Sequence, residues 1–152
     1  MERLRGIRHT RCLALLGLLE DQSSLDHPGT VTHPDQQVDW LSDNQRKGIS
    51  ELPSFTLHAN DEYSQKYWDA SDEERVPHLL GVAEEFLGAR VTQWSVHRWG
   101  FAKPVVTFGD SHWHSEDLAL TLAGDGFGGE RVENAFLSGW NAADAILKRS
   151  SS

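Results

Sequence analysis

The sequence predicts a mixed fold of β-strands and α-helices, of the α/β or α+β class. Apolar residues form strand-length runs at residues 12–19, 53–59 and 91–99. Apolar residues with a helical repeat cover residues 71–87 and 131–148. Because strands, a helix, further strands and a final helix follow one another, we expect a layered fold in which helices cover a sheet.

The remaining elements are shorter or more polar. Residues 21–37 carry His27-Pro28-Gly29 and His33-Pro34, which predicts a long loop or a hairpin tip. A short strand is expected at residues 38–42 and a polar turn at residues 43–48. Residues 100–116 are expected to form a loop or hairpin.

The first helical segment, residues 71–87, contains start and stop signals. Ser71 and Glu74 have the spacing of a capping box. Gly88 is a natural residue just past the C-terminus of a helix. Because Pro77 has no backbone N–H to donate, we expect this helix to be kinked or to start late.

The C-terminal segment carries the clearest pattern. Residues 118–123 alternate large and small side chains without a charge, which is typical of a strand covered on both faces. A glycine-rich turn with one carboxylate follows at residues 124–129, and the next helix is expected to start near Glu130 or Arg131. Glycines let a ligand approach the backbone, and a helix start presents unpaired N–H groups. The pattern is equally consistent with a cradle for a polar, electron-rich ligand and with a plain strand-to-helix connection.

The same turn matches the dinucleotide-binding pattern Gly-x-Gly-x-x-Gly through Gly124, Gly126 and Gly129. That fingerprint also requires a second strand after the helix, with an acidic residue at its end about 20 residues on. Here the acidic candidate, Asp144, lies within the predicted helix. We therefore expect the turn to end a fold and not to open a Rossmann unit.

Length and charge limit the possible functions. A chain of 152 residues has the length of a single domain and is long enough to bury a hydrophobic core. A net charge of −9 and a pI of about 5.2 disfavour binding to nucleic acid or to anionic lipid. The single cysteine, Cys12, excludes an internal disulfide and lies in an apolar run, so a buried, inert thiol is expected.

The N-terminal region imitates a short signal peptide. Four arginines precede the apolar run at residues 12–19, but that run has only eight residues and is followed by Glu20-Asp21-Gln22 in place of a cleavage site. We expect a buried strand there. No stretch approaches the roughly 20 apolar residues of a membrane span, and a cytoplasmic location is expected.

Four residues are candidate metal ligands: Asp110, His112, His114 and Glu116. Their spacing of two residues would place them on one face of an extended strand, and imidazole with carboxylate suits zinc. The stretch is loop-like, however, and no further His or Cys is near. We expect a polar hairpin without a metal; a small metal-binding module using His112 and His114 is the least favoured reading.

Two segments resemble the C-terminal part of the renalase-like FAD-dependent oxidoreductases, within the flavin amine oxidase superfamily. They are residues 94–104 (Trp-Ser-Val-His-Arg-Trp-Gly-Phe-Ala-Lys-Pro) and 122–129 (Leu-Ala-Gly-Asp-Gly-Phe-Gly-Gly). Residues 131–139 continue the similarity. Three further segments resemble the substrate domain of the same family: residues 11–16, 43–48 and 55–59. Taken together, the similarity extends from about residue 11 to residue 147.

The resemblance implies a Rossmann-type FAD domain interleaved with a substrate domain. Residues 1–103 would be a partial substrate-binding domain, with its sheet and helix, and residues 104–152 a C-terminal, FAD-contacting strand-turn-helix. Members of the family open with a Gly-x-Gly-x-x-Gly turn for the FAD pyrophosphate, and nothing before Arg11 matches it. A complementary N-terminal chain or self-association is therefore expected.

The implied cofactor is FAD, and the implied contacts lie mainly in the glycine turn. Gly124, Asp125 and Gly126 would lie at the ribityl–phosphate part of FAD, and the backbone N–H groups near Phe127 and Gly128 would face the flavin N1–C2=O edge. The alternative role for Asp125 is that of a turn-forming residue.

Outside the turn, Arg98 and Trp99 resemble the strand that passes the reactive face of the flavin, or they belong to a structural Trp-rich strand. Lys47 is expected to be a solvated turn lysine and His58 to end a strand. The catalytic residues are not identified by the resemblance.

The implied activity is hydride transfer from a small molecule, an amine or a reduced nicotinamide-like substrate, to the flavin, with reoxidation by O₂. The alternative is a non-catalytic half-domain that docks on a partner chain.

Overall fold

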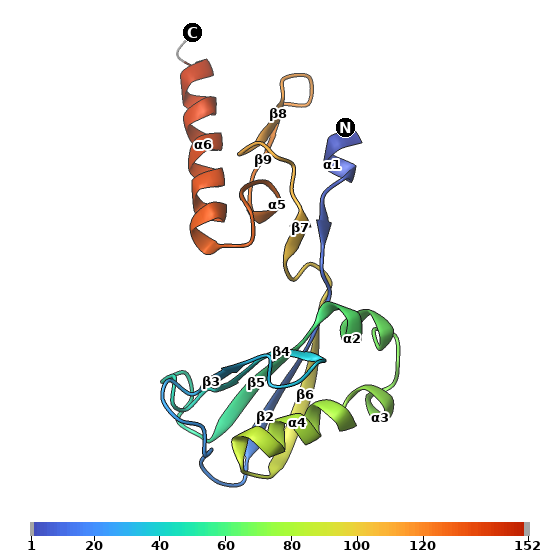
Figure 1. Cartoon of the computed structure of the whole chain (residues 1–152). Helices are drawn as coiled ribbons and strands as arrows, with labels where there is room; N and C mark the ends of the chain where they lie inside the picture. Colours follow the sequence, from blue (N-terminus) through green and yellow to red (C-terminus); the bar gives the residue numbers. More distant parts are fainter. Residues whose placement is uncertain (1, 151–152) are drawn as a thin grey trace. The chain divides into compact units, whose positions relative to one another are not determined.

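The computed structural model describes residues 2–150 and divides the chain into two compact units. The sheet unit comprises Arg11–Gly100, and the terminal unit combines Met1–Thr10 with Phe101–Ser152. Cys12 pairs with Trp99, so the sheet unit begins and ends on adjacent strands. The expected mixture of strands and helices is confirmed (Figure 1).

The sheet unit is built on a five-stranded sheet in the order β3-β4-β5-β2-β6. Its strands, in chain order, are β2 (Cys12–Leu19), β3 (Thr30–Thr32), β4 (Val38–Asp43), β5 (Ser54–Ala59) and β6 (Val91–Trp99). All of its pairings are antiparallel. The predicted strands at residues 12–19, 38–42, 53–59 and 91–99 are confirmed, whereas β3 lies in the segment expected to be a long loop or a hairpin tip.

Three helices follow β5 in this unit: α2 (Asp61–Lys66), α3 (Asp72–Arg75) and α4 (Pro77–Leu87). The single helix predicted at residues 71–87 is divided, because Pro77 cannot donate a helical hydrogen bond and occupies the first turn of α4 instead. The predicted capping box is wrong, since the Ser71 side chain makes no capping hydrogen bond. Gly88 ends α4 in the left-handed conformation, with φ of 64°, as expected.

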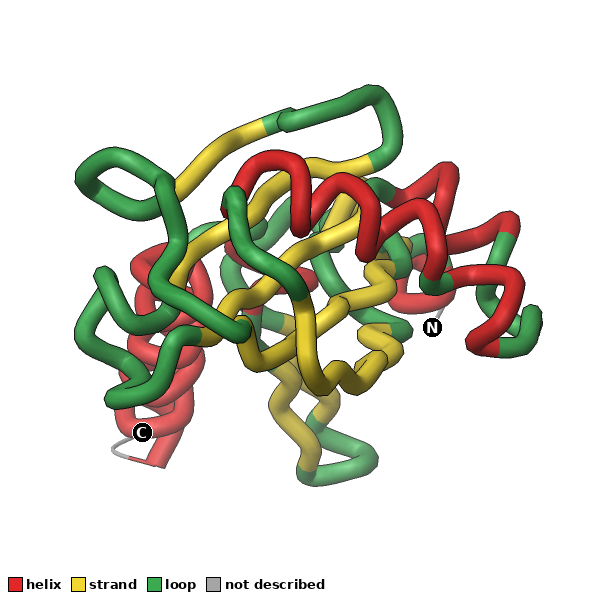
Figure 2. Tube along the Cα trace, turned by 90° about the horizontal axis from the view of Figure 1, so that it is seen from below, coloured by secondary structure: helices red, strands yellow, loops and turns green. Residues whose placement is uncertain are grey.

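The core of the sheet unit lies between one face of the sheet and α4. Leu13, Leu15, Leu41 and Leu57 from the strands are fully buried. They belong to one cluster with Leu79, Val82, Ala83 and Leu87 of α4. Figures 1 and 2 show α4 crossing the strands. Cys12 is buried, as predicted.

The terminal unit consists of short paired strands and one long helix. Its elements are α1 (Glu2–Arg5), β1 (Arg8–His9), β7 (Pro104–Val106), β8 (Trp113–Ser115), β9 (Leu120–Leu122), α5 (Asp125–Gly128) and α6 (Val132–Ser150). Strand β1 pairs with β7 and β8 pairs with β9, both antiparallel. Because β1 comes from the first ten residues, both ends of the chain contribute to this unit.

The expected buried strand at residues 118–123 is wrong. Only Leu120–Leu122 is a strand, and Leu118 and Leu120 are 60% and 41% exposed. Ala119 has φ of 46°, and its N–H donates to the carbonyl oxygen of Glu116, so the chain turns immediately before β9. That turn makes β8 and β9 a short hairpin and prevents a longer strand.

Between residues 2 and 150, no helix has both the length and the apolar character needed to cross a membrane.

Candidate functional site

The glycine-rich segment connects β9 to α6, as predicted, but it contains a turn of helix. Gly124 has φ of 135°, α5 covers Asp125–Gly128, and Gly129 has φ of 106°. The sequence did not predict this helical turn through Gly126. Helix α6 begins at Val132, within two residues of the expected start.

The backbone N–H groups of this segment are largely engaged within it. Phe127 and Gly128 both donate to the carbonyl oxygen of Gly124, at 3.1 and 3.0 Å, and Gly129 donates to that of Asp125 at 2.8 Å. In this conformation the Phe127 and Gly128 N–H groups do not point out as donors for a flavin edge.

Asp125 is fixed at one carboxylate oxygen and open at the other. Its Oδ1 accepts a hydrogen bond from the Gly126 N–H at 2.7 Å and lies 3.7 Å from Nε2 of His9. Its Oδ2 makes no hydrogen bond to the part of the chain that the structure describes. The Asp125 side chain is 49% exposed, whereas that of His9 is 14% exposed. Asp125 is thus a turn former that still presents one carboxylate oxygen to a ligand.

A buried serine anchors the start of the turn. The Ser138 hydroxyl, on α6, accepts a hydrogen bond from the Gly124 N–H at 2.8 Å and donates to the carbonyl oxygen of Ser111 at 2.5 Å. Ser138 is 1% exposed. These bonds join the turn, the long helix and the segment before β8.

Phe108, which lies between β7 and β8, anchors the middle of the turn and is itself held by Arg3 of α1. The Phe108 N–H donates to the Gly126 carbonyl oxygen at 2.9 Å, and the rings of Phe108 and Phe127 lie 5.2 Å apart. The Arg3 guanidinium lies 4.2 Å from the Phe108 ring centre, and it donates to the Phe108 carbonyl oxygen at 2.9 Å and to Asp110 at 2.8 Å. Sequence reasoning missed these supporting residues, because Arg3 and Phe108 are 105 positions apart and form no local motif.

Close packing accounts for one of the glycines in the turn. A Cβ at Gly128 would clash with the carbonyl oxygen of Asn134, so this glycine lets α5 pack against the first turn of α6. At Gly124, a Cβ would meet no atom within 4 Å, and the positive φ alone favours glycine. Space for a ligand is therefore found at Gly124 and not at Gly128.

Arg98 and Trp99 lie on β6, an edge strand of the sheet unit. Arg98 donates to the Trp68 carbonyl oxygen at 3.2 Å, and its guanidinium lies 5.7 Å from the Trp68 ring centre. Trp99 is 52% exposed and packs edge-on against His97, at 4.5 Å between ring centres. These contacts favour the structural interpretation. Arg98 and Trp99 belong to the sheet unit and the glycine turn to the terminal unit, so the structure describes them as separate groups.

Lys47 and His58 both contact Trp40. The Lys47 ammonium lies 4.5 Å from the Trp40 ring centre, and the His58 and Trp40 rings are 5.1 Å apart on paired strands. Both side chains therefore have structural partners in the sheet unit.

The two histidines of the candidate metal site lie within hydrogen-bond distance of hydroxyl groups. Nδ1 of His112 lies 3.0 Å from the Ser111 hydroxyl, and Nδ1 of His114 lies 2.8 Å from the Thr121 hydroxyl across the β8–β9 pair. Asp110 is paired with Arg3. In the described range, no group of three or more His, Cys, Asp or Glu residues could hold a metal ion.

No protein-family model matches this sequence.

Proposed function

We propose that this chain contributes the C-terminal part of a renalase-like FAD-dependent oxidoreductase and contacts the ribityl–phosphate part of FAD through Asp125. The proposal rests on the resemblance of residues 94–104 and 122–129 to that family. The observation that carries it is the Asp125 carboxylate, which is oriented by the Gly126 N–H at one oxygen and belongs to a half-exposed side chain. A carboxylate suits sugar hydroxyls, because each of its oxygens accepts hydrogen bonds.

The residues present fit one end of the cofactor. Asp125 offers an acceptor and Gly124 leaves open space, but the Phe127 and Gly128 N–H groups are engaged with Gly124. The pyrophosphate and the adenosine would be held by a Rossmann-type unit supplied with this chain in the working enzyme. Bound FAD would supply the hydride-accepting chemistry, with an amine or a reduced nicotinamide-like compound as donor and O₂ as the final electron acceptor.

The role of this chain is then to position the flavin end of the cofactor. The turn is held from two sides, by Ser138 on α6 and by Phe108, which keeps the Asp125 backbone in place. In this proposal, the flavin contacts lie within residues 104–152, and the sheet unit, Arg11–Gly100, forms part of the substrate domain.

An NMR titration of the purified chain with FAD at up to millimolar concentration tests the proposal, since it detects the weak binding expected from one end of the cofactor. The amide signals of residues 124–129 should shift. Asp125→Ala should weaken the binding by roughly 1.5–3 kcal/mol, the scale of a hydrogen bond to a charged group. The control is Asp117→Ala, which removes an exposed carboxylate of the same unit outside the turn. Absence of shifts, or equal FAD affinity in Asp125→Ala, would refute the Asp125 contact.

A second candidate function is a non-catalytic half-domain that docks on a partner chain. The observation in its favour is the exposed apolar surface of α6, where Val132, Phe136, Trp140 and Leu147 are 86%, 63%, 66% and 67% exposed. Surfaces of this kind mark interaction sites or lead to aggregation. The mass of the chain in solution and its visible spectrum test this: self-association without flavin supports docking, and a yellow monomer with stoichiometric FAD contradicts it.

A further inference from the structure

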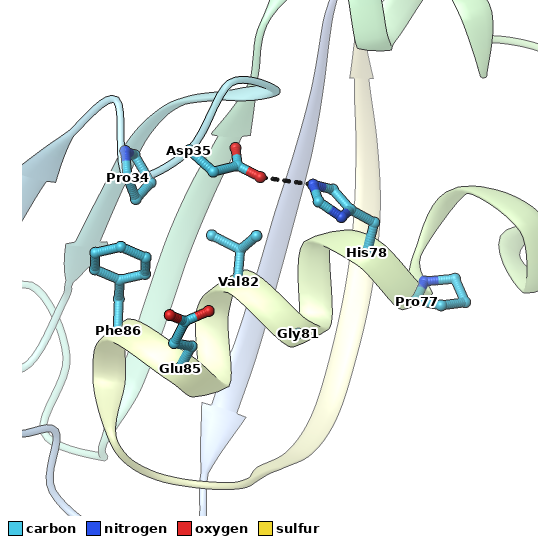
Figure 3. A pocket seen from close by; sticks show the side chains of 8 residues that line it. All are labelled: Pro34, Asp35, Pro77, His78, Gly81, Val82, Glu85 and Phe86. Atoms are coloured by element: carbon cyan, nitrogen blue, oxygen red, sulfur yellow. Dashed lines mark hydrogen bonds and ion pairs between the residues drawn. The ribbon is translucent and has the colours of Figure 1, made fainter.

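The sheet unit contains a groove that the proposed flavin contacts do not use. It has a volume of about 520 Å³ and lies between the loop at Pro34 and Asp35 and one face of α4 (Figure 3). None of its lining residues belongs to the segments that resemble the flavin enzymes at residues 94–104 and 122–129.

One face of α4 forms the floor of the groove. His78, Gly81, Val82 and Glu85 follow one another at the spacing i, i+3, i+4 and i+7, which places them on the same side of a helix. Seven residues of helix rise about 10.5 Å. The groove therefore has a polar group near each end, His78 and Glu85, with Gly81 and Val82 between them.

The end at His78 is fixed by Asp35. Oδ1 of Asp35 accepts hydrogen bonds from the N–H groups of Gln37 and Val38, both at 2.8 Å, and Oδ2 lies 2.7 Å from Nε2 of His78. The carboxylate thus fixes the imidazole as the Nε2–H tautomer when the ring is neutral. This leaves the Nδ1 lone pair as a hydrogen-bond acceptor, next to the negative charge of Asp35.

No close packing contact requires a glycine at position 81. A glycine in a helix interior costs roughly 0.5–1 kcal/mol relative to alanine. A Cβ at this position would meet no atom within 4 Å, and the backbone of Gly81 does not adopt the left-handed conformation. The missing side chain leaves open space over the helix, between the two polar ends of the groove.

The walls of the groove are apolar. Pro34 and Phe86 are half-buried and Val82 is 6% exposed, so the space over Gly81 is bordered by hydrocarbon. Glu85 is exposed at the end opposite His78. An occupant that matches this arrangement has two hydrogen-bond-donating cationic ends and an aliphatic middle.

We propose that this groove binds an extended aliphatic dication, such as a linear α,ω-diamine. One ammonium pairs with the Glu85 carboxylate, the methylene chain lies over Gly81 and Val82, and the other ammonium donates to Nδ1 of His78 beside Asp35. Each ammonium carries three donors, and both ends of the groove supply acceptors next to a carboxylate. The net charge of −9 on the chain also attracts a dication. This inference does not depend on the proposed flavin chemistry.

Calorimetric titration of the whole chain with 1,7-diaminoheptane, whose extended length is comparable to the separation of the two ends, tests the proposal. We expect saturable binding at one site. Heptylamine lacks the second cation and 1,3-diaminopropane is too short, so each should bind at least about tenfold more weakly, equal to 1.4 kcal/mol. Absence of saturable binding, or equal affinity for heptylamine, would overturn the proposal.

Gly81→Ala separates binding from folding. The new methyl group should raise the melting temperature, because alanine favours the helix, and should lower the affinity for the diamine at least about tenfold by filling the groove. Gly139→Ala is the matched control, since Gly139 lies in α6 and its Cβ would also meet no atom within 4 Å. That control should gain stability and keep the affinity of the unchanged chain. Unchanged affinity in Gly81→Ala would overturn the proposal.

Glu85→Gln tests the charge at the other end of the groove. We expect at least about a tenfold loss of affinity for the diamine. Glu74→Gln is the control, because it makes the same change in net charge at an exposed site on α3, outside the groove. An equal loss in both variants would show general attraction of cations to an acidic chain and would overturn the site.

Discussion

The hydroxyl of Ser138 accepts a hydrogen bond from the Gly124 N–H at 2.8 Å, across 14 positions of sequence. Ser138 lies on α6 and Gly124 follows β9, so one buried side chain joins the long helix to the start of the glycine turn. The conformation of the turn that carries Asp125 therefore depends on how α6 packs within its own unit.

Ser138→Ala should destabilise the terminal unit by roughly 1–3 kcal/mol, because the variant loses two hydrogen bonds of a buried hydroxyl. Alanine is the better helix former, so helix propensity alone predicts the opposite sign. Urea unfolding measures the change. Ser71→Ala is the control: Ser71 is exposed and makes no capping hydrogen bond, and its change should stay below about 0.5 kcal/mol. Equal effects of the two variants would contradict the anchoring role.

The elements that the sequence predicted best are those with long, regular apolar patterns. Strands β2 and β6 have the predicted bounds, since each contains eight or nine residues of strand-like composition. Strand β3 was missed, because its three residues lie in a polar segment and are held by pairing with β4, which no local pattern reveals. The strand predicted at residues 118–123 is wrong although the apolar pattern is present, because a turn at Ala119 interrupts the segment.

The candidate site, too, could be predicted from the sequence only where its pattern is local. The glycine turn could be located from sequence, because the change from apolar strand to glycines to helical repeat is local. Its supports could not be located, since Arg3, Phe108 and Ser138 reach it from distant parts of the chain. The α5 turn was also missed, because glycines have a low helix propensity, whereas the structure holds this turn by hydrogen bonds from Gly128 and Gly129 to the carbonyl oxygens of Gly124 and Asp125.

Two buried serines of the sheet unit should respond to alanine in opposite ways. Ser64 is fully buried, and its hydroxyl accepts a hydrogen bond from the Leu13 N–H at 2.9 Å, so Ser64→Ala should cost roughly 1–3 kcal/mol. The Ser54 hydroxyl is buried without a hydrogen-bond partner among the described residues. Ser54→Ala removes an unsatisfied polar group and should be neutral or stabilising. Chemical unfolding of both variants provides the comparison, and a loss of more than about 1 kcal/mol in Ser54→Ala would reveal a partner for that hydroxyl.

Gly17 is required by close packing inside the sheet. A Cβ there would lie 2.5 Å from the Phe55 ring and 2.7 Å from the Gln93 carbonyl oxygen, which belongs to the paired strand β6. We expect Gly17→Ala to lower the free energy of unfolding by roughly 1–3 kcal/mol, the scale of overpacking in a core. Gly139→Ala, at an open helical site, should change it in the opposite direction.

A double variant identifies the cause of that loss. Phe55→Leu removes the ring that the new methyl group would meet, so Gly17→Ala should cost less in the Phe55→Leu background than in the unchanged chain. Strictly additive effects in urea unfolding would show that the Phe55 ring is not the obstacle.

Tyr63 should make the sheet unit sensitive to alkaline pH. Burial, with smaller contributions from Tyr67 and Asp35, raises the pKa of the Tyr63 phenol from 10.0 to about 12. The folded state therefore keeps a proton that the unfolded state releases. The stabilisation from Tyr63 is fully present below pH 10 and is lost as the pH rises toward 12.

The pKa of Tyr63 can be measured directly, because the chain has only two tyrosines. In Tyr67→Phe, Tyr63 is the remaining tyrosine. Because burial, the largest cause of its raised pKa, is retained, its phenolate absorbance should appear at a higher pH in the folded chain than in urea, where it should appear near pH 10. Tyr63→Phe loses the hydrogen bond to the Arg75 carbonyl oxygen, so its stability at neutral pH should drop by about 1 kcal/mol. Its further loss of stability between pH 10 and 12 should be smaller than in the unchanged chain, because the phenol that titrates in this window is gone. Parallel stability curves for the two proteins across that window would show that burial of Tyr63 does not shift its titration.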